Sequence, residues 1–113
     1  MRHYNILKTT TTLQPEQPEK IEASFLLSEA SRILSLRAAE RDCENTGERS
    51  MMEIVRTFNS LTGHNLTEPD GWSFMLLLKM VRARKGVARE DDYVDMVSYS
   101  ALLGESRLNE TKS

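Results

Sequence analysis

A capping motif followed by an almost unbroken apolar segment constrains this chain more than any other feature. The letters TEPD at residues 67–70 place Thr67 as an N-cap, a proline in the first turn and Asp70 at the third helical position. From Trp72 to Val81 the chain is apolar on nearly every side. A helix of that kind must be covered over most of its surface. We therefore predict that it is the central element, covered in part by a second copy of the protein.

Apolar residues recur at spacings of three and four elsewhere in the chain, which is typical of amphipathic helices. Leu26, Ala30 and Leu34 show this spacing in one segment, and Met51 and Val55 show it in another. Together with the capped segment, the pattern predicts helices over about 21–41, 48–61, 67–85 and 89–105. The fold class that we expect is all-α, a compact four-helix domain that packs into a homo-oligomer.

The two ends of the chain have a different composition from the middle. Residues 1–20 hold a run of four threonines and two prolines, which favour neither a helix nor a buried segment. Residues 106–113 are mostly polar. We therefore predict a flexible N-terminal arm at 1–20, a helical domain at 21–105 and a disordered tail at 106–113.

The charge balance and the single cysteine limit the possible settings. The chain has 113 residues, 15 basic against 17 acidic, and a net charge of −2. This balance gives no general attraction to nucleic acid, which we consider an unlikely partner. Cys43 has no second cysteine to pair with, and no apolar run reaches the ~18 residues of a membrane span. We expect a cytoplasmic protein with no membrane partner.

The segment KMVRARKGVAREDDYVD at residues 79–95 is basic before its glycine and acidic after it. A short turn there would make the two flanking helices antiparallel neighbours. Lys79 would then lie near Asp95, and Arg82 near Asp92. Two ion pairs between helices would explain the charge pattern without any ligand.

The same four residues also allow a different interpretation. Asp92 and Asp95 are spaced i, i+3 on one helix face, and Mg²⁺ commonly binds one or two carboxylates together with substrate phosphates. Lys79 and Arg82, spaced in the same way, would hold the phosphates. This alternative predicts a metal site at Asp92 and Asp95 and a phosphate site at Lys79 and Arg82.

Two arginines on the predicted first helix are further candidates. Arg37 and Arg41 lie one turn apart at the end of its apolar stripe. Their stems can pack on the core while the charged heads reach water. Alternatively, their planar donor groups bind a phosphate or carboxylate, so both belong to the candidate phosphate-binding set.

Four ordered motifs resemble a family of short helical proteins encoded by phages and prophages, which is described as a domain of unknown function. The motifs are TGERSM at 46–51, FNSLTG at 58–63, LTEPDGWSFMLLLKMVRARKG at 66–86 and DDYVDMVSYSALLGE at 91–105. The resemblance covers about residues 24–105. It implies a phage or prophage origin and action inside an infected bacterium, and it brings no catalytic residues with it.

A fainter likeness links the chain to the all-α nucleotide pyrophosphatases, which hold Mg²⁺ on carboxylates borne by helices. Asp92 and Asp95 match the second half of that pattern. The first half, a pair of glutamates at Glu-x-x-Glu spacing, is not formed by the acids available, which are Glu40, Glu44, Glu48 and Glu53. The likeness leaves the catalytic residues unknown.

Two functional hypotheses follow. The first is a non-catalytic accessory protein without a cofactor, which assembles with itself and binds a host or phage protein. Its six methionines suit adaptable contacts. The second is a Mg²⁺-dependent nucleotide-binding or pyrophosphohydrolase-like protein that uses Asp92 and Asp95 with Lys79 and Arg82. The incomplete set of acids favours the first.

Overall fold

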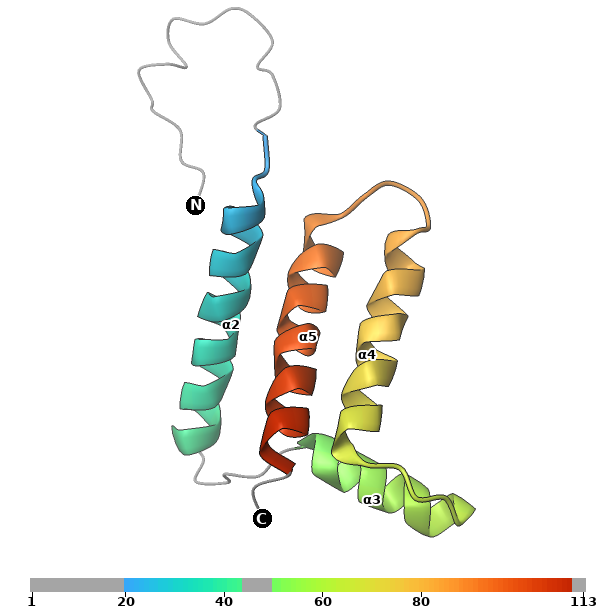
Figure 1. Cartoon of the computed structure of the whole chain (residues 1–113). Helices are drawn as coiled ribbons and strands as arrows, with labels where there is room; N and C mark the ends of the chain where they lie inside the picture. The colour runs from blue at the N-terminus through green and yellow to red at the C-terminus, as the bar shows by residue number, and fades with distance from the viewer. Residues whose placement is uncertain (1–19, 44–49, 111–113) are drawn as a thin grey trace, which may run out of the picture.

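The computed structural model describes residues 20–43 and 50–110, except for the side chains of 41–43. Within these ranges every element is a helix, and there is no strand (Figure 1). The helices are α2 (Ala23–Cys43), α3 (Ser50–Thr62), α4 (Glu68–Ala83) and α5 (Glu90–Glu110). The predicted all-α class with four helices is therefore confirmed. Residues 1–19 of the predicted arm and 111–113 of the predicted tail lie outside the described residues, and residues 106–110 continue α5.

The three long helices stand side by side, with α5 between α2 and α4 (Figure 1). α5 packs against both neighbours, whereas α2 and α4 do not pack against each other. The prediction that the 68–83 helix is the central element is therefore wrong, because that helix lies at an edge. The helix with small buried side chains takes the central position instead: Val94 and Ser98 of α5 are 4% and 2% exposed, which lets other helices approach closely.

The predicted start of α4 is confirmed in atomic detail. The Thr67 backbone N–H donates to Asp70 Oδ2 at 2.8 Å, and the Asp70 backbone N–H donates to Thr67 Oγ1 at 3.4 Å. This reciprocal pair satisfies two donors that a helix start leaves free. Gly63 and Gly86 have φ of +79° and +68°, and each follows the end of a helix. Glycine adopts this left-handed conformation without strain, so the local sequence sets these boundaries.

α3 lies across the lower end of α4, at the opposite end of the molecule from the α4–α5 turn (Figure 1). Its buried residues Met51 and Val55 meet α4 at Gly71, where a β-carbon would collide with Met51 and make a tight contact with Val55. The Asn59 side chain holds the loop between α3 and α4 in place. It donates to the Leu66 carbonyl and accepts from the Leu66 N–H, both at 2.9 Å. Gly71 therefore allows the close approach that positions α3.

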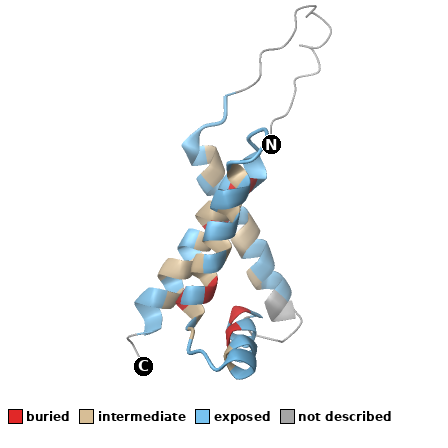
Figure 2. Cartoon of the chain, turned by 90° about the vertical axis from the view of Figure 1, so that its right-hand side faces the viewer, coloured by how far each residue is buried: buried red, intermediate tan, exposed pale blue. Residues whose placement is uncertain are grey.

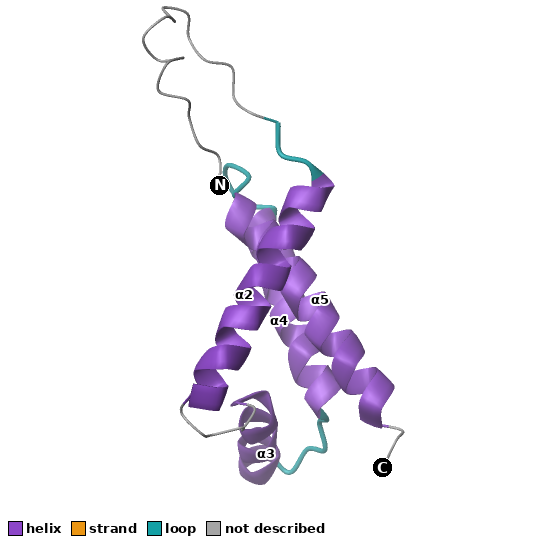
Figure 3. Cartoon of the chain, turned by 90° about the vertical axis from the view of Figure 1, so that its left-hand side faces the viewer, coloured by secondary structure: helices purple, strands orange, loops and turns teal. Residues whose placement is uncertain are grey.

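The buried core is small. In the described part of the chain the buried apolar side chains are Ala30, Met51, Val55 and Val94, and Figure 2 shows how few residues are buried along the long helices. Figure 3 shows a reason: α2 crosses the α4–α5 pair and diverges from it toward the C-terminal end of α2. One layer of helices leaves two open faces, so much apolar surface stays accessible. None of the described helices combines the length and hydrophobicity needed to cross a bilayer.

Candidate functional site

A charged groove lies at the end of the molecule where α4 turns into α5. Its volume is about 520 Å³. We call it the charged groove, and its lining residues are Ile33, Lys79, Arg82, Lys85, Arg89, Asp91, Asp92 and Asp95. The structure thus brings together the four residues of the predicted phosphate and metal sites on α4 and α5. Sequence reasoning missed Lys85, Arg89 and Asp91, although all three belong to the same charged segment.

Inside the groove, Lys79 and Asp95 join the two helices. Lys79 Nζ lies 2.8 Å from Asp95 Oδ2, and the side chains are 16% and 27% exposed. Farther along the same interface, the rings of Trp72 and Tyr99 stack at 6.0 Å. The predicted antiparallel pairing of the two helices and one of its two predicted ion pairs are therefore confirmed. The ion pair also means that neither charge is fully available to a ligand.

The second predicted ion pair, between Arg82 and Asp92, is not formed. The structure gives neither residue an ion pair with any residue that it describes. Three residues along a helix turn the side-chain direction by about 300°, so Arg82 points about 60° away from the line on which Lys79 meets α5. Asp92 is only 9% exposed and lies in the first turn of α5, where the helix dipole favours a negative charge.

Charges in the groove remain available for a ligand. Arg82, Lys85 and Arg89 are exposed and make no ion pair within the described part of the chain. Together with the partly neutralised Lys79, they form a positive rim around Asp91 and Asp92. No group of three or more His, Cys, Asp or Glu among the described residues is arranged to hold a metal ion. The exposed guanidinium and ammonium groups of the rim are donors of the kind that bind phosphate.

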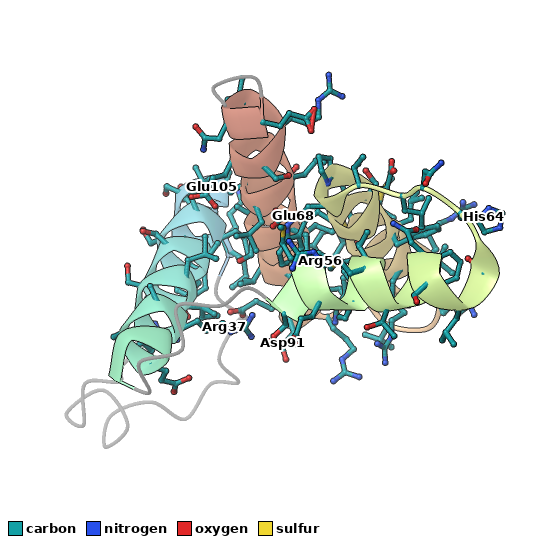
Figure 4. The ribbon with its side chains drawn as sticks, turned by 90° about the horizontal axis from the view of Figure 1, so that it is seen from below. Arg37, Arg56, His64, Glu68, Asp91 and Glu105 are labelled. Carbon is teal, nitrogen blue, oxygen red and sulfur yellow. The ribbon has the colours of Figure 1, made fainter. Side chains whose placement is uncertain are left out.

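The two candidate arginines of α2 do not join this groove. Arg37 lines a separate cavity of about 400 Å³, in the wedge where α2 and α5 diverge, and Figure 4 shows it projecting from α2 at the end where α3 lies. The remaining lining is largely apolar and includes Leu34, Met51, Trp72 and Tyr99. The side chain of Arg41 lies outside the described residues. Arg37 and the groove cations thus do not form one phosphate site.

Comparison with known proteins yields a family but no activity. Residues 26–107 match DUF6378, a family described as a domain of unknown function. The match spans the charged groove, the whole of α3 and α4, most of α2 and α5, and the loop that follows α3. No curated protein and no solved structure matches the chain. The site must therefore be interpreted from its own geometry.

Proposed function

We propose that this chain, which belongs to the DUF6378 family, is a non-catalytic accessory protein of a phage or prophage. It assembles with itself and binds a host or phage protein in the cytoplasm of the infected bacterium. The observation that carries this proposal is a row of large apolar residues along α4, on the side away from α5. We call this row the outer face of α4: Phe74, Leu77, Leu78 and Val81, which are 59%, 52%, 42% and 51% exposed.

Exposed apolar area on this scale favours association. Removing apolar surface from water stabilises by roughly 25 cal/mol per Å². Contiguous apolar patches on soluble proteins mark interaction surfaces more often than scattered apolar residues do. α3 adds a second apolar row at the lower end of α4, because Ile54, Phe58 and Leu61 are 58%, 40% and 80% exposed. These two rows place seven large apolar side chains, each at least 40% exposed, on the surface of the protein.

The mass of the protein in solution tests this proposal. The full chain has a mass of 12.9 kDa, and we expect light scattering at micromolar concentration to give a multiple of that value. Incubation of the same sample with Mg²⁺ and a panel of nucleoside triphosphates should produce no hydrolysis. A protein that is strictly monomeric, or one that turns over a nucleotide, would contradict the proposal.

A second candidate function is favoured by the charged groove. There, exposed cations surround two carboxylates that have no ion pair in the described structure, Asp91 and Asp92. This arrangement supports a Mg²⁺-dependent nucleotide-binding or pyrophosphohydrolase-like protein. Arg82 with Lys79 would contact phosphate, and Asp92 with Asp95 would hold a hydrated Mg²⁺, whose coordination shell is usually completed by water and substrate oxygens.

Thermal denaturation with nucleotides and Mg²⁺ tests this second candidate. A nucleotide at 100 times its dissociation constant should stabilise by about 2.7 kcal/mol and raise Tm by about 10 °C. Arg82→Gln and Asp95→Asn should each abolish the shift. Arg56→Gln is the matched control, because this arginine is also exposed but lies on α3, at the other end of the molecule. A Tm that no nucleotide changes rules this function out.

A further inference from the structure

We infer that the outer face of α4 packs against the same face of a second copy, with the two helices antiparallel about a two-fold axis between Leu77 and Leu78. This inference rests on the self-association proposed above and deepens it, since it names the surface, the partner and the orientation. The evidence is the direction of the outer face, the self-complementary order of its residues and the charges at its two ends.

The outer face points away from everything that α4 contacts within the described chain. At about 100° per residue, Phe74, Leu77, Leu78 and Val81 fall within one sector about 100° wide. Trp72 and Lys79, which join α4 to α5, lie on the opposite side of the helix. α4 is also the edge helix of the layer, with no described helix beyond it except α3 at its lower end (Figure 1). A second copy can therefore approach along most of this face.

The order of residues along the face is complementary to itself in the antiparallel direction. With the axis between Leu77 and Leu78, Leu77 lies opposite Leu78 of the second copy. One turn farther out, Phe74 lies opposite Val81 of the second copy, so each large aromatic ring meets a smaller side chain. A two-fold interface requires this kind of self-complementary patch, whereas an unrelated partner does not.

The charges at the two ends select the same orientation. Asp70 is exposed and falls in the same sector as the apolar row. The exposed Lys85, which lines the charged groove, lies just beyond the C-terminal end of α4, at the same distance along the chain from the midpoint of the row as Asp70. In an antiparallel pair, Asp70 and Lys85 of the second copy come to the same end of the interface. A parallel pair would place Asp70 against Asp70 and Lys85 against Lys85. Exposed charges add little affinity, but like charges held opposite each other disfavour the wrong orientation.

The position of α3 fits the antiparallel arrangement. α3 extends beyond α4 at the N-terminal end of α4, beneath the outer face (Figure 1). An antiparallel second copy brings the turn after its own α4 to this end. That turn carries Val87, which is 84% exposed, and the nearby apolar residues of α3 include Leu61, which is 80% exposed. Two of the most exposed apolar side chains of the protein thus come to the same end of the interface.

Substitution of one leucine tests the surface. Leu77→Asp places two carboxylates next to the axis of each dimer, and we expect it to weaken dimerisation at least about 100-fold. Leu36→Asp is the matched control, because Leu36 on α2 is 53% exposed and Leu77 is 52% exposed. This control should change the dissociation constant less than about threefold. Sedimentation equilibrium gives both constants, and far-UV circular dichroism confirms that both variants are helical.

Spin labels test the orientation. A label at Arg84→Cys, in a chain that also carries Cys43→Ser, should lie about 20 Å along the helix axis from its counterpart, since each label is displaced from the two-fold axis by 1.5 Å per residue. A parallel pair would bring the two helix axes, and hence the labels, to about 10 Å. A dimer that survives Leu77→Asp, or a short label distance, overturns this inference and leaves self-association intact. A monomeric wild-type protein overturns both proposals.

Discussion

The two sides of α4 are both rich in apolar residues, but within the described part of the chain only one of them packs against another long helix. The inner side faces α5, where Trp72 stacks on Tyr99 and Lys79 pairs with Asp95. The outer side carries Phe74 and Leu77, which are more than half exposed. Hydrophobicity does not distinguish the two sides. The covered side also makes an ion pair and a ring contact with α5. Both contacts are directional, so they favour packing of this side against α5.

α3 repeats this contrast on a smaller scale. Met51 and Val55 are both 6% exposed against α4, whereas Ile54 and Leu61 of the same apolar stripe are 58% and 80% exposed. α3 therefore joins the covered and the uncovered surfaces of the protein. Substitutions should lower the free energy of unfolding strongly at buried positions. At exposed apolar positions they should change it little.

The largest loss of stability should come from a buried methionine of α3, and its exposed neighbour is the comparison. Met51 is 6% exposed and Met52 is 36% exposed. Met51→Ala removes a side chain from the core and should lower the free energy of unfolding by about 2–5 kcal/mol. Met52→Ala should lower it by less than about 1 kcal/mol. Urea denaturation of both variants measures the difference. Equal losses would show that α3 buries both of its sides in solution.

A pair of glycines tests how closely α3 approaches α4. A β-carbon at Gly71 collides with Met51 and lies 3.1 Å from Val55 Cγ2, whereas a β-carbon at Gly104 meets nothing within 4 Å. Gly71→Ala should lower the free energy of unfolding by about 1–3 kcal/mol through overpacking. Gly104→Ala should raise it by about 0.5–1 kcal/mol, because alanine favours a helix. If both variants gain stability, the tight contact between α3 and α4 does not exist.

A double-mutant cycle measures how much the ion pair in the charged groove holds the covered side of α4. Lys79→Gln and Asp95→Asn should show a coupling free energy of about 1 kcal/mol, since the pair is short and mostly shielded from solvent. The control pair is Arg107 and Glu110, which lie 3.7 Å apart with side chains 69% and 44% exposed. Its coupling should be near zero. Similar coupling free energies for the two pairs would show that the Lys79–Asp95 pair does not hold α4 against α5.

The smallest effect should come from an ion pair formed between two residues of the same helix, α2. The Glu29 carboxylate accepts hydrogen bonds from the Arg32 guanidinium, the shorter at 2.9 Å, which lowers the pKa of Glu29 below its ordinary 4.5. The ionised Glu29 carboxylate contributes to stability fully above pH 4.5, and this contribution is lost as the pH falls through the lowered pKa of Glu29. NMR titration should show the pKa of Glu29 rising in Arg32→Gln. An unchanged pKa would mean that the pair is absent in solution.

Much of the local structure was predictable from particular residues. Thr67 and Asp70 indicated the start of α4, and the glycine within residues 79–95, Gly86, indicated the turn after it, because capping and left-handed backbone conformations depend on a few adjacent residues. The Lys79–Asp95 pair was also predictable, since a short turn fixes which residues of two antiparallel helices meet. The end of α5 at Glu110 was not, because its last turns have no strong stop signal.

The sequence by itself determined the helical class, the capped start of α4, the turn between α4 and α5 and the Lys79–Asp95 pair across it. The tertiary structure decided that α5 rather than α4 is central, that Arg37 lies away from the charged groove and that the outer face of α4 stays open. The reason is physical. Local signals act through neighbouring backbone groups, whereas the placement of whole helices depends on which distant side chains fit together. The sequence shows that a helix has an apolar face to bury. Only tertiary packing determines whether another helix of the same chain buries that face.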